Sequence, residues 1–287
     1  MTTRMKYSPI SPKYWWLLFL GVLLLGACGG PAPTPRLRIS ALPEIEPELL
    51  IKRMDLLTPY LSTDCNQRFT FVPMLDRSEL TTAVTEGRID LAFMDVAAFQ
   101  SLEQSAGHRI VIPDAEKDAA GVVLTRADGS LNKLQNLNGE EFLCTYEYST
   151  TGHLLPLEQL KRNNSKPTLR FVMDARELCR MLVRGEAPAG AVPSVDWDVL
   201  ESDFPELREM AVTTGLANGA WVVRDGLDAD MVQAITGAFL RLNWHHPYHR
   251  RILEIFGVRE FIPVDAETFR DSDRIIGRLV HEWKTGN

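Results

Sequence analysis

Between residues 37 and 112 the hydrophobic positions switch between two periods. Four short apolar runs predict strands, at residues 37–42, 69–74, 89–94 and 109–112. Between these runs, apolar residues recur every three or four positions and predict helices, at residues 47–61, 78–86 and 95–105. Strands that alternate with helices in this way predict a parallel sheet with helices on both faces.

The same alternation continues in a second unit that begins near residue 121. Its strands are predicted at residues 121–126, 142–146, 169–172 and 189–192, and its main helices at 149–163 and 174–184. After a strand at 221–223, periodic runs predict helices near 228–244, 248–256 and 266–284. The predicted fold class is therefore α/β in two units, each a mainly parallel sheet with flanking helices. A chain of 287 residues is long enough for both units to bury a core.

The first 27 residues have the pattern of a targeting segment. Three basic residues precede an apolar run at residues 14–25, which is too short to span a bilayer permanently. The sequence Leu-Gly-Ala-Cys that ends at Cys28 resembles a bacterial lipobox, which implies cleavage before Cys28 and lipid attachment to it. Residues 28–35 are rich in Pro and Gly and predict an extended tether. We therefore expect a lipid-anchored protein on the periplasmic side of a bacterial membrane. The sequence does not decide between the inner and the outer membrane.

Composition narrows the class of partner. The chain is 45% hydrophobic and 24% charged, which is ordinary for a globular protein. The formal net charge is −7, and removal of residues 1–27, with three basic residues and no acid, leaves −10. No cluster of Lys and Arg stands out, so we expect no nucleic-acid partner, because phosphate neutralisation needs a basic patch.

Three cysteines remain after the predicted cleavage: Cys65, Cys144 and Cys179. An oxidising compartment permits a disulfide, but an odd number leaves at least one thiol free, and the pairing cannot be deduced from sequence. Cys144 alternates with Phe142 in a predicted strand, and Cys179 lies in a predicted helix. We interpret both as core thiols rather than nucleophiles.

Three consecutive hydroxyl residues, Ser149, Thr150 and Thr151, stand between a predicted strand and a predicted helix, and Gly152 follows them. Such residues at a helix N-terminus commonly accept bonds from otherwise unpaired backbone N–H groups. The positive end of the helix dipole can also hold an anion there. The residues alone leave both interpretations open, a plain helix cap and an anion site.

Several segments together resemble one family, the substrate-binding proteins of phosphate, phosphite and phosphonate ABC importers, which have the type II periplasmic binding fold. They are Leu42-Pro43, residues 82–93, residues 131–142, residues 149–152 with Pro156, and Gly185 with residues 189–192. The resemblance implies two α/β lobes, one at residues 36–120 plus 216–287 and the other at residues 121–215. It also implies a ligand cleft between the lobes and hinge closure that presents a new surface to a permease.

The same resemblance implies which residues bind the ligand, a small phosphate- or phosphonate-like oxyanion: Ser149, Thr150, Thr151, Gly152, Phe93, Asp95 and Arg176. Relatives often have Tyr at the position of Phe93 and Gly at that of Asp95. Asp95 is expected to cap its own helix, to bind an amine of the ligand or to disfavour a dianion. Relatives that bind phosphonates commonly have His where Ala175 aligns. The neighbouring Arg176 either contacts the oxyanion or lies on a solvated helix face.

Other clusters carry weaker signals. His245, His246 and His249 resemble a metal cluster, but Pro247 interrupts their helix, which favours a surface loop, and we expect no metal and no cofactor. His153 either borders the cleft or lies on the surface. No catalytic triad, P-loop or paired-carboxylate pattern stands out, which argues against an enzyme.

We expect a monomeric solute-binding protein that delivers its ligand to an ABC permease. The alternative is a sensory or adaptor lipoprotein that reports its ligand to a membrane sensor. An enzyme on the same fold is the third and weakest hypothesis.

Overall fold

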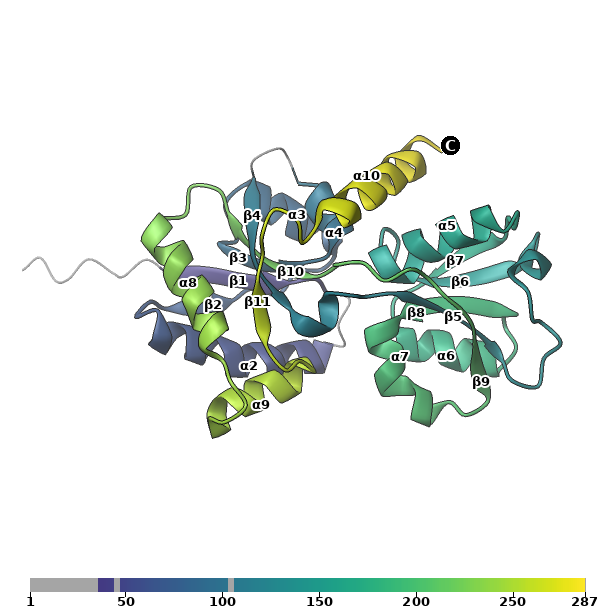
Figure 1. Ribbon diagram of the computed structural model, residues 1–287, viewed down its shortest axis with the longest axis horizontal. Coiled ribbons are helices and arrows are strands. Elements are labelled where there is room, and N and C mark those ends of the chain that lie inside the picture. Colours follow the sequence, from purple (N-terminus) through teal and green to yellow (C-terminus); the bar gives the residue numbers. More distant parts are fainter. Residues whose placement is uncertain (1–35, 44–46, 103–105, 287) are drawn as a thin grey trace, which may run out of the picture. The chain divides into compact units, whose positions relative to one another are not determined.

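Two β-sheets organise the part of the chain that the structure describes (Figure 1). The structure is a computed structural model and describes residues 36–43, 47–102 and 106–286. The predicted signal peptide, the tether and Cys28 lie outside the described residues. None of the described helices is both long and apolar enough to cross a membrane.

The first sheet has six strands in the order β11-β4-β10-β3-β1-β2. Their bounds are β1 (Leu37–Ala41), β2 (Phe69–Phe71), β3 (Leu91–Met94), β4 (Gly107–Pro113), β10 (Ala220–Arg224) and β11 (Phe261–Pro263). The four strands predicted from the N-terminal part all point in one direction. They do not form one parallel series, however, because β10 lies between β3 and β4 and is antiparallel to both. The sheet is therefore mixed, where the sequence predicted a mainly parallel one.

Helices cover both faces of the first sheet. Successive side chains of a strand point to opposite faces, so apolar residues on both faces need to be covered. Leu91 and Trp221 face one core, which α2 (Pro47–Asp64), α8 (Ala229–Arg241) and α9 (Pro247–Phe256) complete. Their neighbours Ala92 and Val222 face a second core with α3 (Arg77–Thr85) and α4 (Val96–Gln100). The adjacent residues are buried on opposite faces, which explains why these strands are apolar at nearly every position.

The second sheet has five strands in the order β7-β6-β8-β5-β9. They are β5 (Gly121–Arg126), β6 (Glu141–Thr145), β7 (Thr168–Val172), β8 (Ala189–Pro193) and β9 (Leu207–Val212). β6, β7 and β8 pair in parallel, whereas β5 is antiparallel to both of its neighbours. The sequence did not predict β9, of whose six residues only Leu207 is buried.

Short helices surround this sheet. The regular ones are α5 (Leu155–Arg162), α6 (Ala175–Val183) and α7 (Ser194–Leu200), and a π-helix, η4 (Thr150–Leu154), precedes α5. Two 3₁₀ segments, η3 (Leu134–Leu137) and η5 (Glu201–Asp203), complete this unit, and η2 (Asp114–Glu116) lies in the connection from β4 to β5.

Two chain connections join the sheets, one from β4 to β5 and one from β9 to β10. They run side by side at Ala119 and Leu216, which exchange both backbone hydrogen bonds at 3.0 Å.

The C-terminal helix α10 (Arg270–Thr285) contacts elements beside both sheets. Its apolar residues share one core with α4 and with Leu154 and Leu155 of the second unit.

The cysteines are core residues. Cys65, Cys144 and Cys179 are buried free thiols. Burial raises the pKa of Cys65 to about 11 and that of Cys179 to about 12, and it raises the pKa of Cys144 further. Because a thiol needs to ionise in order to attack or to bind a metal, the interpretation of Cys144 and Cys179 as packing residues is confirmed.

Candidate functional site

The hydroxyl turn that follows β6 caps the helix after it. The side-chain Oγ of Ser149 accepts a hydrogen bond from the backbone N–H of Gly152 at 3.1 Å. Thr150 and Thr151 are buried in the first turn of η4. Gly152 is required here, because a Cβ at this position would lie 1.9 Å from Oγ1 of Thr145. The capping role predicted for the turn is confirmed.

Asp95 caps α4 and reaches beyond its own helix. Its Oδ1 accepts from the N–H of Ala98 at 2.8 Å, which is ordinary N-capping. Its Oδ2 accepts from the backbone N–H of Thr150 at 3.3 Å. In return, the Oγ1 of Thr150 accepts from the N–H of Ala97 at 3.3 Å. The helix starts that follow β3 and β6 therefore meet and hold each other through these two residues.

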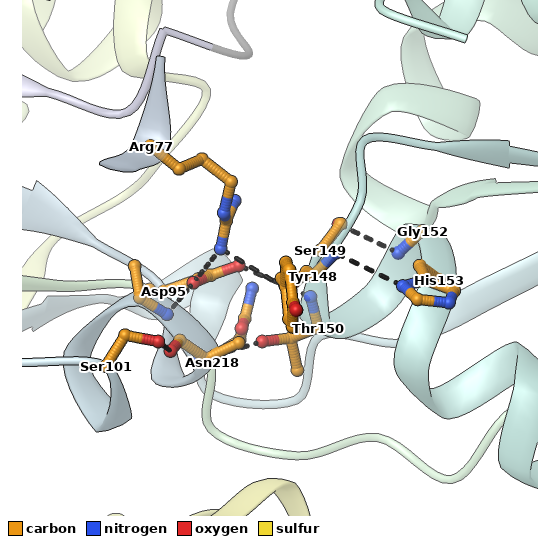
Figure 2. Close-up of polar contacts among 12 residues, drawn as sticks. Arg77, Asp95, Ser101, Tyr148, Ser149, Thr150, Gly152, His153 and Asn218 are labelled. Atoms are coloured by element: carbon orange, nitrogen blue, oxygen red, sulfur yellow. Dashed lines mark hydrogen bonds and ion pairs between the residues drawn. The ribbon is translucent and has the colours of Figure 1, made fainter. Parts of the chain in front are cut away.

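Arg77 supplies the positive charge at this point. It is the first residue of α3, and its Nη2 lies 2.5 Å from Oδ1 of Asp95 and 3.4 Å from the backbone oxygen of Tyr148. The side chains of Arg77 and Asp95 are only 14% and 8% exposed. Figure 2 shows Arg77 and Thr150 approaching Asp95 from different elements. The arrangement is a desolvated carboxylate that a guanidinium and two backbone N–H groups hold.

His153 lies immediately behind the turn and is fully buried. Its Nδ1 accepts from the backbone N–H of Tyr148 at 3.2 Å, and its ring packs edge-on against Phe171 and Trp283. Burial, together with the charge of Arg77, lowers the pKa of His153 to about 4. The imidazole is therefore neutral at physiological pH. The surface position considered for His153 is wrong, because Trp283 of α10 covers it.

The other two predicted site residues, Phe93 and Arg176, have different contacts. Phe93 is half-buried at the end of β3, where its ring lies 5.6 Å from that of Trp221 and against the backbone of Gly219. Arg176 lies on α6, is partly exposed, and pairs with Asp203 at 2.6 Å. The solvated helix face considered for Arg176 is thus what the structure has, and Arg176 does not join the group around Thr150.

Sequence reasoning missed Arg77. The position of Arg77 in the sequence could have indicated it, because Arg77 follows β2 and starts α3 next to the capping residue Asp76. The carboxyl ends of parallel strands meet at one edge of a sheet. A cation that follows β2 is therefore expected on the same side as Asp95, which follows β3.

A second charged group joins α2, η2 and α7. Glu116 accepts from the N–H of Gly219 at 2.9 Å and from Nδ2 of Asn218 at 3.1 Å. Burial raises the pKa of Glu116. Burial and the charge of Glu116 together raise the pKa of Asp196 to about 7. Arg53 is within electrostatic range of both acids, and burial lowers its pKa. The charge of Arg53 thus shifts the pKa of both Glu116 and Asp196, and their charges shift that of Arg53.

The histidine cluster forms no metal site. His245 and His246 are exposed, and His246 stacks on His249 with ring centroids 4.2 Å apart. Across residues 36–43, 47–102 and 106–286, no group of three or more His, Cys, Asp or Glu side chains is arranged to hold a metal ion.

Comparison with known proteins assigns the family. A family model described as "ABC transporter, phosphonate, periplasmic substrate-binding protein" matches residues 39–269. A curated relative from Prochlorococcus marinus (strain MIT 9301), "Probable ABC transporter phosphite binding protein PhnD1", is 21% identical over 265 residues. This alignment covers 85% of the present chain and 89% of the relative.

Solved structures share the fold. PhnD1 from Prochlorococcus marinus in complex with methylphosphonate aligns with a TM-score of 0.79 at 19% identity, covering 86% of this chain and 98% of that one. XAC2383 from Xanthomonas citri bound to chloride ion aligns with a TM-score of 0.76 at 19% identity, covering 88% and 99%. Two mixed sheets with flanking helices are the fold of type II periplasmic binding proteins, which confirms the predicted fold class. The chain belongs to the family of periplasmic substrate-binding proteins of phosphonate ABC transporters, a family of binding proteins rather than enzymes.

Proposed function

We propose that this protein captures a small phosphorus oxyanion, of the phosphonate, phosphite or phosphate type, and delivers it to an ABC permease. One observation carries the proposal. The N–H of Thr150, which follows the second sheet's β6, and the guanidinium of Arg77, which follows the first sheet's β2, converge on one carboxylate. Backbone N–H groups and guanidinium groups are the donors that bind phosphate-like oxygens in proteins. The point where the two sheets' strand ends meet is thus already built to hold an anion.

The proposed binding residues are those that the family resemblance implies, with one change. They are Ser149, Thr150, Thr151 and Gly152, with Asp95 and Phe93 at the end of β3. We propose Arg77 as the cation of the site, because Arg176 pairs with Asp203 instead. The proposed lobes are residues 36–120 plus 216–287 and residues 121–215, and the paired connections at Ala119 and Leu216 support a hinge between them.

The lipid anchor at Cys28 rests on the sequence. We propose cleavage before Cys28, attachment of acyl chains to it, and residues 28–35 as the tether that holds the protein at the periplasmic surface of a membrane. Expression of the full chain with radiolabelled palmitate should label the protein, and Cys28→Ser should abolish the label. Cys65→Ser serves as the control, since Cys65 is buried and should leave the label unchanged. Wild-type protein without label would exclude the anchor.

Ligand binding is tested by thermal unfolding of the full chain in detergent with phosphate, phosphite, methylphosphonate, 2-aminoethylphosphonate, sulfate and carboxylates. A ligand at a hundred times its dissociation constant should add about 2.7 kcal/mol to the free energy of unfolding. Arg77→Ala, which removes the proposed cation, should remove most of this ligand-induced gain, whereas Arg176→Ala, at an arginine that pairs with Asp203 instead, should keep it. A protein that no oxyanion in this panel stabilises would contradict the proposal.

The sensory or adaptor function is the second candidate. The observation that favours it is that the protein's own carboxylate already engages the N–H of Thr150. A binding fold that reports its state to a membrane sensor does not need tight ligand capture. Affinity purification from membranes distinguishes the two, because an importer component should bring down ABC permease subunits and an adaptor should bring down a sensor protein.

A further inference from the structure

We propose that the carboxylate of Asp95 occupies the place of the ligand's oxyanion and is a built-in competitor that sets the affinity of the site for anions. This inference rests on the proposed function and deepens it. The carboxylate binds the donors that a phosphonate would use. A ligand therefore has to displace it before the donors become available.

The contacts of the carboxylate are those of a bound anion. Its two oxygens accept from three donors on three elements: Nη2 of Arg77 on α3, the N–H of Thr150 on η4 and the N–H of Ala98 on α4. Asp95 is 6% exposed and Thr150 is fully buried, so water does not supply these bonds. A guanidinium combined with helix N-terminal N–H groups is the donor set that recognises phosphate and carboxylate alike.

Helix capping alone does not account for these contacts. Three other aspartates cap helices in the described part of the chain, and each accepts a bond from the N–H three residues later: Asp76, Asp174 and Asp228. For these three caps the structure records no hydrogen bond to the other sheet's unit. Asp95 differs in being buried, in pairing with Arg77 and in binding Thr150, which is 55 residues away in sequence. Capping requires only the bond to Ala98.

Competition lowers the apparent affinity. When only a fraction of the protein has the donors free, the apparent dissociation constant is the intrinsic constant divided by that fraction. A second effect acts in the same direction, because a displaced carboxylate beside a bound dianion repels it at short range. Doubly charged oxyanions are therefore the ligands that Asp95 disfavours most.

Asp95→Asn isolates the charge. Asparagine has the same shape and caps a helix about as well as aspartate, so α4 is retained while the competing carboxylate and its pairing with Arg77 are lost. Asp228→Asn is the matched control, because it makes the same substitution at an exposed helix cap on α8. Asp95→Ser, a neutral cap with a shorter reach, is the second variant should Asp95→Asn fail to fold.

The test is isothermal titration calorimetry of the full-length proteins with methylphosphonate, phosphite and phosphate at pH 8. Asp95→Asn should bind at least one of these anions more tightly than wild type, by about tenfold, and Asp228→Asn should bind like wild type.

If wild type binds an anion and Asp95→Asn binds it equally or more weakly, the competitor role is wrong while the proposed function stands. If 2-aminoethylphosphonate alone binds and Asp95→Asn loses it, Asp95 contacts an amine and the inference is overturned. If no variant binds any of them, the proposed function and this inference fall together.

Discussion

The rings of His153 and Trp283 pack edge to face with their centroids 4.5 Å apart, and this contact ties the hydroxyl turn to the C-terminal helix. His153 belongs to η4, directly after the proposed oxyanion donors. Trp283 lies near the end of α10, and its Nε1 donates to Glu147 at 3.0 Å. Farther back in the same helix, Asp273 pairs with Arg109 of β4 at 2.7 Å. One helix thus holds elements of both sheets' units.

Trp283→Ala should loosen this tie. The substitution removes the ring contacts with His153 and Phe171 and the bond to Glu147. We expect a loss of about 2 kcal/mol in the free energy of unfolding, less than for a fully buried Trp because this one keeps part of its surface exposed. Chemical denaturation measures it. Trp244→Ala, at a tryptophan that is 39% exposed, is the control and should cost less than half as much.

His153 should make stability depend on pH. Burial holds its folded-state pKa at about 4, below the ordinary 6.5. Between these values the unfolded chain binds a proton that the folded protein does not, so this contribution to stability is lost as the pH falls from 6.5 to 4. The slope is about 1.4 kcal/mol per pH unit. Denaturation across this range should show that wild type loses stability relative to His153→Phe as the pH falls. A difference that is constant with pH would contradict the burial of His153.

Asp196 should act in the opposite direction. Burial, reinforced by the charge of Glu116 and partly offset by Arg53, raises its pKa to about 7 from 3.8. The folded protein then holds a proton that the unfolded chain releases, so the stability that Asp196 contributes is lost as the pH rises through about 7. Asp196→Asn should gain stability relative to wild type as the pH rises from 4 to 7. Asp198→Asn, at an exposed position two residues farther along the chain, should show no such trend.

Leu75 and Met173 are predicted to contact the permease. Both are strongly exposed, at 88% and 68%, and each directly precedes an aspartate that caps a helix after a parallel strand. They occupy equivalent positions on the two sheets' units, beside the strand ends where the ligand is proposed to bind. The double variant Leu75→Asp, Met173→Asp should keep ligand affinity within about twofold and lower ligand-stimulated ATP hydrolysis by the reconstituted transporter about tenfold. Leu240→Asp, on α8, is the control. Loss of ligand affinity in the double variant would argue for a structural role instead.

Local signals in the sequence determined most of the secondary structure. The apolar stripes predicted α2, α8, α9 and α10 close to their observed bounds, because each stripe needs one side of a helix to be buried. The same pattern predicted that β1 to β4 point in one direction. It could not place β10 between β3 and β4, because strand order depends on pairing between segments more than a hundred residues apart.

The sequence also determined the capping chemistry of the site. Ser149 and Asp95 each accept from an N–H three residues later, and that bond requires only a short polar side chain before a helix. The tertiary structure decided the rest. Asp95 meets Arg77 and Thr150, which are 18 and 55 residues away, and Trp283 covers His153 from α10. Such contacts have no local signature, because they exist only after two separate sheets have brought their strand ends together.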